Sequence, residues 1–135
     1  MSSRENTELG RRFFESQDRL KGGPQPDLCS AGYVAQIGGN PQMAYQGHEA
    51  FAKAFYSAFP DLYHTIEETV ADEQAVTVRF TLRGTHTGNF MGIPATQKPF
   101  EAGAIAILHV VDGKVAELRA QFDQFGMLRE LGVVP

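Results

Sequence analysis

The hydrophobic pattern of this chain changes its period once, near Leu62, and this change constrains the fold more than any other feature. Before it, apolar residues recur every three or four positions, as they do on one face of a helix. After it, apolar and polar residues alternate, as they do on a half-buried strand. Helices followed by a run of strands predict an α+β domain with the helices gathered on one face of an antiparallel sheet.

Three main helices are expected, besides a short one from Asp27. The first covers residues 6–21, with Asn6 or Thr7 as its N-cap and Gly22-Gly23 as its end. The second covers residues 47–59 and carries an aromatic face of Phe51, Phe55 and Phe59. The third covers residues 124–131. The apolar stripe of the first helix is formed by Leu9, Phe13, Phe14, Gln17 and Leu20.

Alternation predicts the strands. They lie at residues 64–70, 76–82, 100–111 and 114–122, after a brief strand at 33–37 and a short helix from Asp27. Asp112-Gly113 between two apolar runs is a strong hairpin signal. A sheet that curls around its own helices leaves a hollow, and small ligands usually bind in such hollows.

Composition narrows the class of protein. A length of 135 residues fits one domain, residues 1–135, and a net charge of −4 without a basic stripe argues against nucleic acid as a partner. No stretch reaches the roughly 18 apolar residues of a membrane span. The single Cys29 excludes an internal disulfide and is expected to pack in the core; with a polar N-terminus, it indicates the cytoplasm.

The histidines show no metal-ligand spacing, and no motif of a cofactor site is present, so neither metal nor cofactor is expected. His48 is expected to be exposed at the start of the second helix. His64 begins a strand, and His86 lies near a loop.

Asp123 is the acid of most interest, because it lies where the last strand meets an apolar helix. Apolar neighbours would raise the pKa of its carboxyl toward neutrality and suit it to general acid–base catalysis. Asp is also a common N-cap, here of the helix at 124–131. Both roles are open from the residues alone.

His109 lies in an otherwise apolar strand, where a lone histidine is more often a core residue than a catalytic one. Whether it can meet Asp123 depends on the hairpin register. A two-residue loop at Asp112-Gly113 places the two side chains on opposite faces of the sheet. A three-residue loop with a glycine bulge pairs Val110 with Lys114 and places them on the same face.

Three segments together resemble the SnoaL-like polyketide cyclase family. Residues 58–62 read AFPDL, residues 83–94 read RGTHTGNFMGIP, and residues 123–132 read DQFGMLRELG. Their order and spacing agree with the family over nearly the whole chain. The resemblance implies a nuclear-transport-factor-2-like roll: a cone-like curved sheet packed against N-terminal helices, usually oligomeric. Because a curved sheet commonly leaves one face to a partner subunit, a homodimer is expected.

The resemblance also implies an intramolecular aldol closure or isomerisation of a polyketide-like carbonyl ester, without metal or cofactor. In the family, an acid/base aspartate precedes the terminal motif and a histidine fourteen residues earlier helps to hold the substrate oxygen. Asp123 and His109 match these positions, which favours the bulged register. Gln121 would assist the enolate, and Arg119 would hold Asp123 ionised. The other expected substrate-binding residues are Phe14, Gln17, Phe51, Phe55 and Met91.

Two other functions stay open. One is an epoxide-hydrolase-like or hydroxylase-like enzyme in which Asp123 and Arg119 activate water. The other is a module that binds an apolar metabolite and catalyses nothing. Both enzyme interpretations require Asp123 to be buried beside a pocket, whereas the binding interpretation predicts a pocket whose polar groups satisfy one another.

Overall fold

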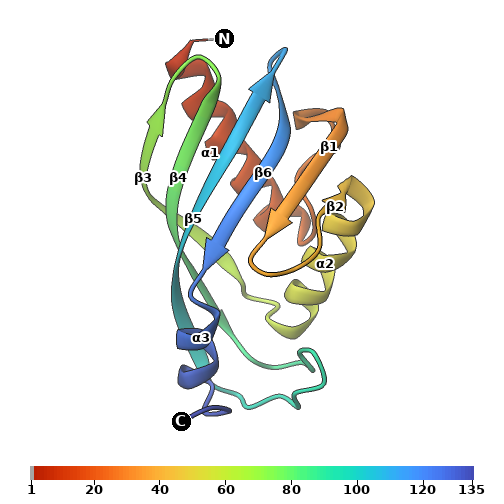
Figure 1. Cartoon of the computed structure of the whole chain (residues 1–135). Helices are drawn as coiled ribbons and strands as arrows, with labels where there is room; N and C mark the ends of the chain where they lie inside the picture. The colour runs from red at the N-terminus through yellow and green to blue at the C-terminus, as the bar shows by residue number, and fades with distance from the viewer. Residues whose placement is uncertain (1) are drawn as a thin grey trace.

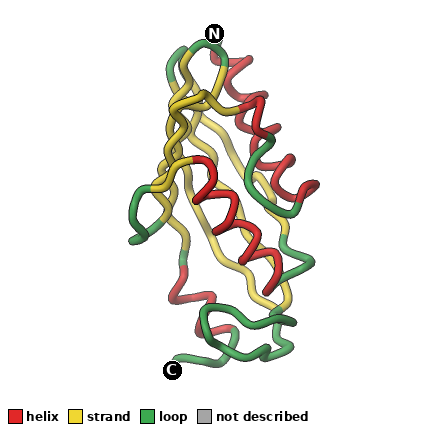
Figure 2. Tube along the Cα trace, turned by 90° about the vertical axis from the view of Figure 1, so that its right-hand side faces the viewer, coloured by secondary structure: helices red, strands yellow, loops and turns green. Residues whose placement is uncertain are grey.

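The computed structural model describes residues 2–135 and confirms the predicted α+β class. Two long helices lie across one face of a curved six-stranded sheet, and a short third helix follows the last strand (Figures 1 and 2). The strand order is β2-β1-β6-β5-β4-β3. The strands are β1 (Cys29–Ile37), β2 (Met43–Ala44), β3 (Tyr63–Ala71), β4 (Ala75–Thr85), β5 (Pro99–Val111) and β6 (Lys114–Phe122).

Strand β1 departs from the expectation of a purely antiparallel sheet, because it pairs with β6 in parallel. It begins at Cys29, directly after a single 3-10 turn at Pro26–Leu28, where a short helix and a later strand were predicted. The other pairs are antiparallel. Register shifts in β3 and β6 mark bulges, and bulges increase the local bend and twist of a strand.

Helix α1 (Ser3–Leu20) begins three residues earlier than predicted. Ser2 caps it and forms a capping box with Glu5, which satisfies free N–H groups of the first turn. Asn6 is not the cap. Its side chain is buried, and its Nδ2 donates to the backbone oxygen of Asp72 at 2.9 Å, which ties the helix to the end of β3.

Helix α2 (Tyr45–Ala58) carries the predicted aromatic face, with Phe55 buried and Phe51 half-buried. Helix α3 (Gln124–Glu130) lies at the opposite end of the molecule from the N-terminus (Figure 1). Helix α1 packs against β3 and β4. No helix among residues 2–135 has the length and apolarity needed to cross a membrane.

The segment that reads GTHTG is packed into the core. The ring of His86 is fully buried and stacks on Phe59, with 5.2 Å between the ring centres. Phe90 packs edge-on against the Phe59 ring, with 5.3 Å between the ring centres. At Gly88 a Cβ atom would lie 2.6 Å from the backbone oxygen of Ser57, so only glycine fits there without a shift. These motif residues fasten the loop to the end of α2.

The inner face of the sheet shows why the fold is hollow. Large side chains of β4 alternate toward the helices, whereas three neighbouring inward positions of β5 and one of β6 carry only a methyl group. Small residues opposite packed helices leave space that the surrounding side chains do not fill. These small inward residues are Ala102, Ala104, Ala106 and Ala120.

Candidate functional site

A largely apolar pocket lies between the inner face of the sheet and helices α1 and α2. Its cavity volume is about 80 Å³, and it is partly open to solvent. Its wall is made of Phe14, Gln17, Ile37, His48, Phe51, Ala52, Phe55, Tyr56, Leu62, His64, Phe80, Leu82, Ala104, Ala120, Gln121 and Phe122. Such a cavity with few polar groups is the usual form of a small-molecule site.

Five of the expected substrate-binding residues lie on this pocket. Phe14 and Gln17 reach it from α1, and Phe51 and Phe55 reach it from α2. Gln121 has an exposed side chain and lies at the rim.

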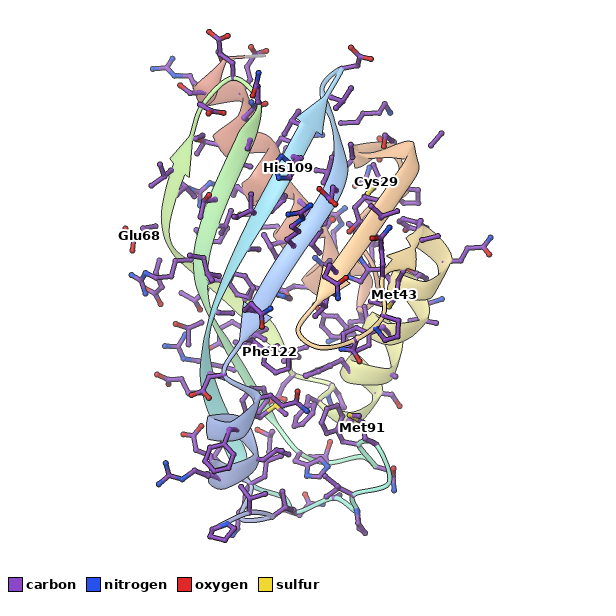
Figure 3. All side chains as sticks on the ribbon, viewed as in Figure 1. Cys29, Met43, Glu68, Met91, His109 and Phe122 are labelled. Carbon is purple, nitrogen blue, oxygen red and sulfur yellow. The ribbon has the colours of Figure 1, made fainter. Side chains whose placement is uncertain are left out.

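Two expected residues do not reach it. Met91 is 75% exposed in the loop between β4 and β5 (Figure 3). Arg119 projects from the outer face of the sheet, with 63% of its side chain exposed, beside Glu117. Both predictions for the pocket wall are therefore wrong.

Asp123 and His109 lie outside the pocket and do not meet. Phe122, the neighbour of Asp123, pairs with Ala104, which is five residues from His109 along β5. At about 3.4 Å per residue this separation is roughly 17 Å. Figure 3 shows His109 near the hairpin end and Phe122 at the other end of β6. The predicted contact between Asp123 and His109 is wrong.

Asp123 takes the alternative role. Its Oδ1 accepts a hydrogen bond from the backbone N–H of Gly126 at 2.8 Å, which makes it the N-cap of α3. The side chain is exposed. The apolar helix lies beside this carboxyl without covering it, so the desolvation that the catalytic interpretation required is absent.

The hairpin explains the position of His109. Val111 pairs with Lys114, so the loop has two residues, and the bulge falls at Ala116 rather than at Gly113. This bulge still places His109 opposite Glu117, on the face shared with the odd-numbered residues of β6. That face is the outer one: the His109 side chain is 46% exposed, and its Nε2 lies 4.0 Å from Glu117.

The pocket instead holds a histidine that is paired with a carboxylate. His64 stands near the start of β3, with only 9% of its side chain exposed. Its Nδ1 lies 2.7 Å from Oδ1 of Asp18 on α1, and its backbone N–H donates to Oδ2 at 2.9 Å. The hydroxyl of Tyr56 donates to the same carboxylate at 2.6 Å.

Two opposed effects act on the Asp18 carboxyl. Burial by itself would raise the pKa of Asp18. The hydrogen bonds from His64 and Tyr56, together with the electrostatic attraction of the His64 ring, outweigh burial, so the pKa of Asp18 lies below its ordinary value. The carboxylate thus stays ionised and keeps the His64 ring in place. The ring is also packed against Phe14 and Phe80, at 5.2 Å and 5.1 Å between ring centres.

A second histidine reaches the pocket from α2. His48 is 2% exposed, which contradicts the expectation of a surface residue. Its Nδ1 lies 2.9 Å from the hydroxyl of Tyr33 on β1. Burial lowers the pKa of His48 to about 4; Glu49 opposes this shift, and the nearby His64 adds to it. His48 is therefore neutral at pH 7.

Part of this arrangement had a signal in the sequence. His48, Ala52 and Phe55 recur every three or four residues, so the period that predicted the aromatic face also predicts a buried His48. Asp18 and His64 carry no such signal, because their contact joins α1 to β3 across 46 residues.

The described residues contain no group of three or more His, Cys, Asp or Glu side chains arranged to hold a metal ion. Cys29 is buried as predicted, and burial raises the pKa of its thiol to about 12. The ionisable side chains of the pocket wall are His48, His64 and Tyr56, and Asp18 is hydrogen-bonded to His64.

Comparison with known proteins assigns this chain to a family. Residues 25–131 match the family described as SnoaL-like polyketide cyclase. The chain belongs to this family. The aklanonic acid methyl ester cyclase DnrD of Streptomyces peucetius is 38% identical over 132 residues, which cover 93% of this chain and 89% of that protein. The predicted family and its cyclase class of enzyme are thereby confirmed.

Solved structures of related proteins have the same fold as this chain. AclR, a putative hydroxylase from Streptomyces galilaeus, superposes with a TM-score of 0.86 at 25% identity, over 99% of this chain and 89% of its own. IdmH, a putative polyketide cyclase from Streptomyces antibioticus, gives a TM-score of 0.83 at 25% identity, over 95% of this chain and 99% of its own.

Proposed function

We propose that this chain catalyses a cofactor-free, intramolecular aldol ring closure of a polyketide-derived carbonyl ester in the pocket between the sheet and the two long helices. The observation that carries the proposal is the His64–Asp18 pair, which opens on an apolar cavity. A histidine oriented by a hydrogen-bonded carboxylate is a common form of general base. The substrate class follows the relatives, which are named as cyclases of aklanonic and nogalonic acid methyl esters.

The chemistry begins at a carbon flanked by two carbonyl groups. Nε2 of His64 takes a proton from this carbon, and the electrons of the C–H bond form an enolate. The enolate carbon attacks another carbonyl of the same molecule, forming a C–C bond and an alkoxide. The imidazolium returns its proton to the alkoxide, so substrate and product have the same mass.

The protein contributes in two ways. Asp18 stabilises the imidazolium that forms on His64, as the buried aspartate of a catalytic triad does. The aromatic walls at Phe14, Phe51 and Phe55 hold the flexible substrate folded, with Gln17 and Gln121 as polar contacts. Holding two reacting groups together is worth an effective concentration of about 10⁵ M or more in favourable cases.

The chain offers a matched test, because it has a second His and Asp outside the pocket. Each purified variant is assayed with aklanonic acid methyl ester by chromatography and mass spectrometry. His64→Gln and Asp18→Asn should lower kcat by roughly 10²-fold or more, the usual contribution of a general base. His109→Gln and Asp123→Asn should leave kcat within about twofold. The reverse pattern would return catalysis to Asp123 and His109 and refute the proposal.

Hydroxylation is the second candidate, favoured by the likeness to AclR. The same assay separates the two reactions, because hydroxylation adds one oxygen atom to the product mass and needs an added reductant. Tight binding of the ester without any product would instead indicate a binding module.

We also propose a homodimer in the cytoplasm. Exposed Ile105, Ile107 and Val111 on the outer face of β5 support the dimer, and the free thiol of Cys29 fits a reducing compartment. Light scattering after size exclusion tests the dimer, and cell fractionation tests the location.

A further inference from the structure

The pocket contains a second histidine that the proposed reaction does not yet use. His48 is buried in the first turns of α2 and forms part of the pocket wall. Its Nδ1 is occupied by the Tyr33 hydroxyl at 2.9 Å, so Nε2 is the nitrogen left for a ligand. What Nε2 can do depends on which ring nitrogen carries the proton.

The direction of the Tyr33–His48 hydrogen bond follows from the burial of both groups. Tyr33 is 2% exposed, and its hydroxyl has no second hydrogen-bond partner among residues 2–135. If Nδ1 of His48 carried the proton and donated it, the Tyr33 hydroxyl hydrogen would be buried without an acceptor, which is costly. If Tyr33 donates to a bare Nδ1, the Tyr33 hydroxyl and Nδ1 are both satisfied. The proton of neutral His48 then lies on Nε2.

His64 has the opposite tautomer. Its Nδ1 faces Asp18, and an ionised carboxylate can only accept a hydrogen bond. The proton of neutral His64 therefore lies on Nδ1, and Nε2 has a free lone pair. One pocket thus contains a bare ring nitrogen and a ring N–H, each fixed by a partner from a different element.

We infer that His48 donates a hydrogen bond from Nε2 to the substrate oxygen that becomes negatively charged, and that Tyr33 positions it for this role. The inference rests on the proposed function and adds to it a catalytic residue and a positioning residue. As Nε2 of His64 takes the carbon-bound proton, the electron pair of the C–H bond moves toward the carbonyl oxygen. The N–H of His48 stabilises that oxygen without transferring its proton.

A neutral donor suits this task. The low pKa of His48 keeps the ring uncharged at pH 7, so the donor does not compete for the proton that His64 removes. The charged and titratable groups around His48 are Glu49 on its own helix, His64 from β3 and Tyr33 from β1. An N–H aimed at a developing oxyanion in a site with little water is a strong source of transition-state stabilisation.

The first experiment reads the tautomers directly and needs no substrate. Long-range ¹H–¹⁵N spectra of the ¹⁵N-labelled protein at pH 7 should show a protonated Nε2 on His48 and a protonated Nδ1 on His64. His48→Gln and His64→Gln assign the signals. A His48 ring that is protonated on Nδ1, or on both nitrogens, would overturn the inference whatever the enzyme turns over.

The second experiment probes the donor with 2-naphthol, an enolate mimic, and with naphthalene as its apolar control. The wild type should bind 2-naphthol about tenfold more tightly than naphthalene, as expected for one well-placed hydrogen bond. His48→Phe should remove this preference, and His48→Gln, which keeps an N–H, should retain part of it. An unchanged preference in His48→Phe would refute the donor role.

Tyr33→Phe tests the positioning role. It should lower kcat about tenfold with little change in KM, and it should shift the His48 ¹⁵N signals toward a tautomer mixture. Tyr45→Phe is the matched control, because the Tyr45 hydroxyl donates to the backbone oxygen of Pro24 and not to a histidine. Equal effects of both substitutions on kcat and on the His48 signals would contradict the positioning role.

The experiments also separate this inference from the proposed function. If the tautomers and the naphthol preference are as expected but no ester is cyclised, the proposed function fails and the assignment of His48 as donor stands.

Discussion

The carboxylate of Asp18 holds His64 at two points, with Oδ1 lying 2.7 Å from the ring Nδ1 and Oδ2 accepting the backbone N–H at 2.9 Å. One side chain of α1 thus fixes both the position of a β3 residue and the orientation of its ring. This contact fastens the helix to the sheet at the wall of the pocket. It also ties the stability of the fold to the protonation of Asp18.

Asp18→Asn should therefore destabilise the protein in a pH-dependent way. The pKa of Asp18 is lowered in the folded state, so its contribution is present above the ordinary value of 3.8 and is lost as pH falls through the folded value. For a partly exposed carboxylate with several hydrogen bonds, the loss at pH 7 should be on the order of 1 kcal/mol. Urea unfolding at pH 7 and pH 3 measures it. An equal gap between variant and wild type at both values would contradict the linkage.

The burial of His48 should make the free energy of unfolding depend on pH in a second, higher range. Its pKa is about 4 in the folded chain against an ordinary value of 6.5, so the unfolded state binds more protons between these values. The wild type should therefore lose up to roughly 3 kcal/mol of stability as pH falls from 6.5 to 4. His48→Gln should lose less over the same range. His109→Gln, at an exposed site, is the control and should follow the wild type in urea titrations.

Filling the cavity should block binding while the fold is preserved. Ala120 lies on the pocket wall, and Ala120→Leu would place a larger side chain in the space. Affinity for 2-naphthol should fall about tenfold or more, since the ligand and the new side chain compete for one volume. Ala54→Leu, at an exposed position of α2, should bind as the wild type does. Fluorescence titration gives both values, and unchanged binding in Ala120→Leu would place the ligand elsewhere.

Asp123 should behave as a helix cap. Asp123→Ala should cost about 1 kcal/mol of folding free energy, because Gly126 loses its acceptor. Asp123→Asn should cost little, since Asn caps as well as Asp does. Thermal or urea unfolding distinguishes the two variants. Equal stability of Asp123→Ala and the wild type would show that the cap contributes nothing to the fold.

The sequence by itself determined most of the elements and the buried faces of the two long helices. The change of period near Leu62, the stripes on α1 and α2 and the hairpin at Asp112-Gly113 are local patterns, and they predicted an α+β domain with a hollow between sheet and helices. Capping rules also gave Asp123 its role as one of two open alternatives. Local patterns succeed here because each depends on residues within a few positions of one another.

The tertiary structure decided the chemistry. A single bulge at Ala116, which no local signal marked, fixed the register that sets His109 opposite Glu117, and the packing of the even-numbered side chains of β5 on the core turns His109 to the outer face. Asp18 meets His64, and Tyr33 meets His48, only because α1 and α2 cross the sheet where they do. Such contacts depend on how whole elements pack, and a shift of one residue in a strand exchanges its inner and outer side chains. The sequence therefore predicted a pocket, whereas the packing of helices on the sheet selected the residues that act in it.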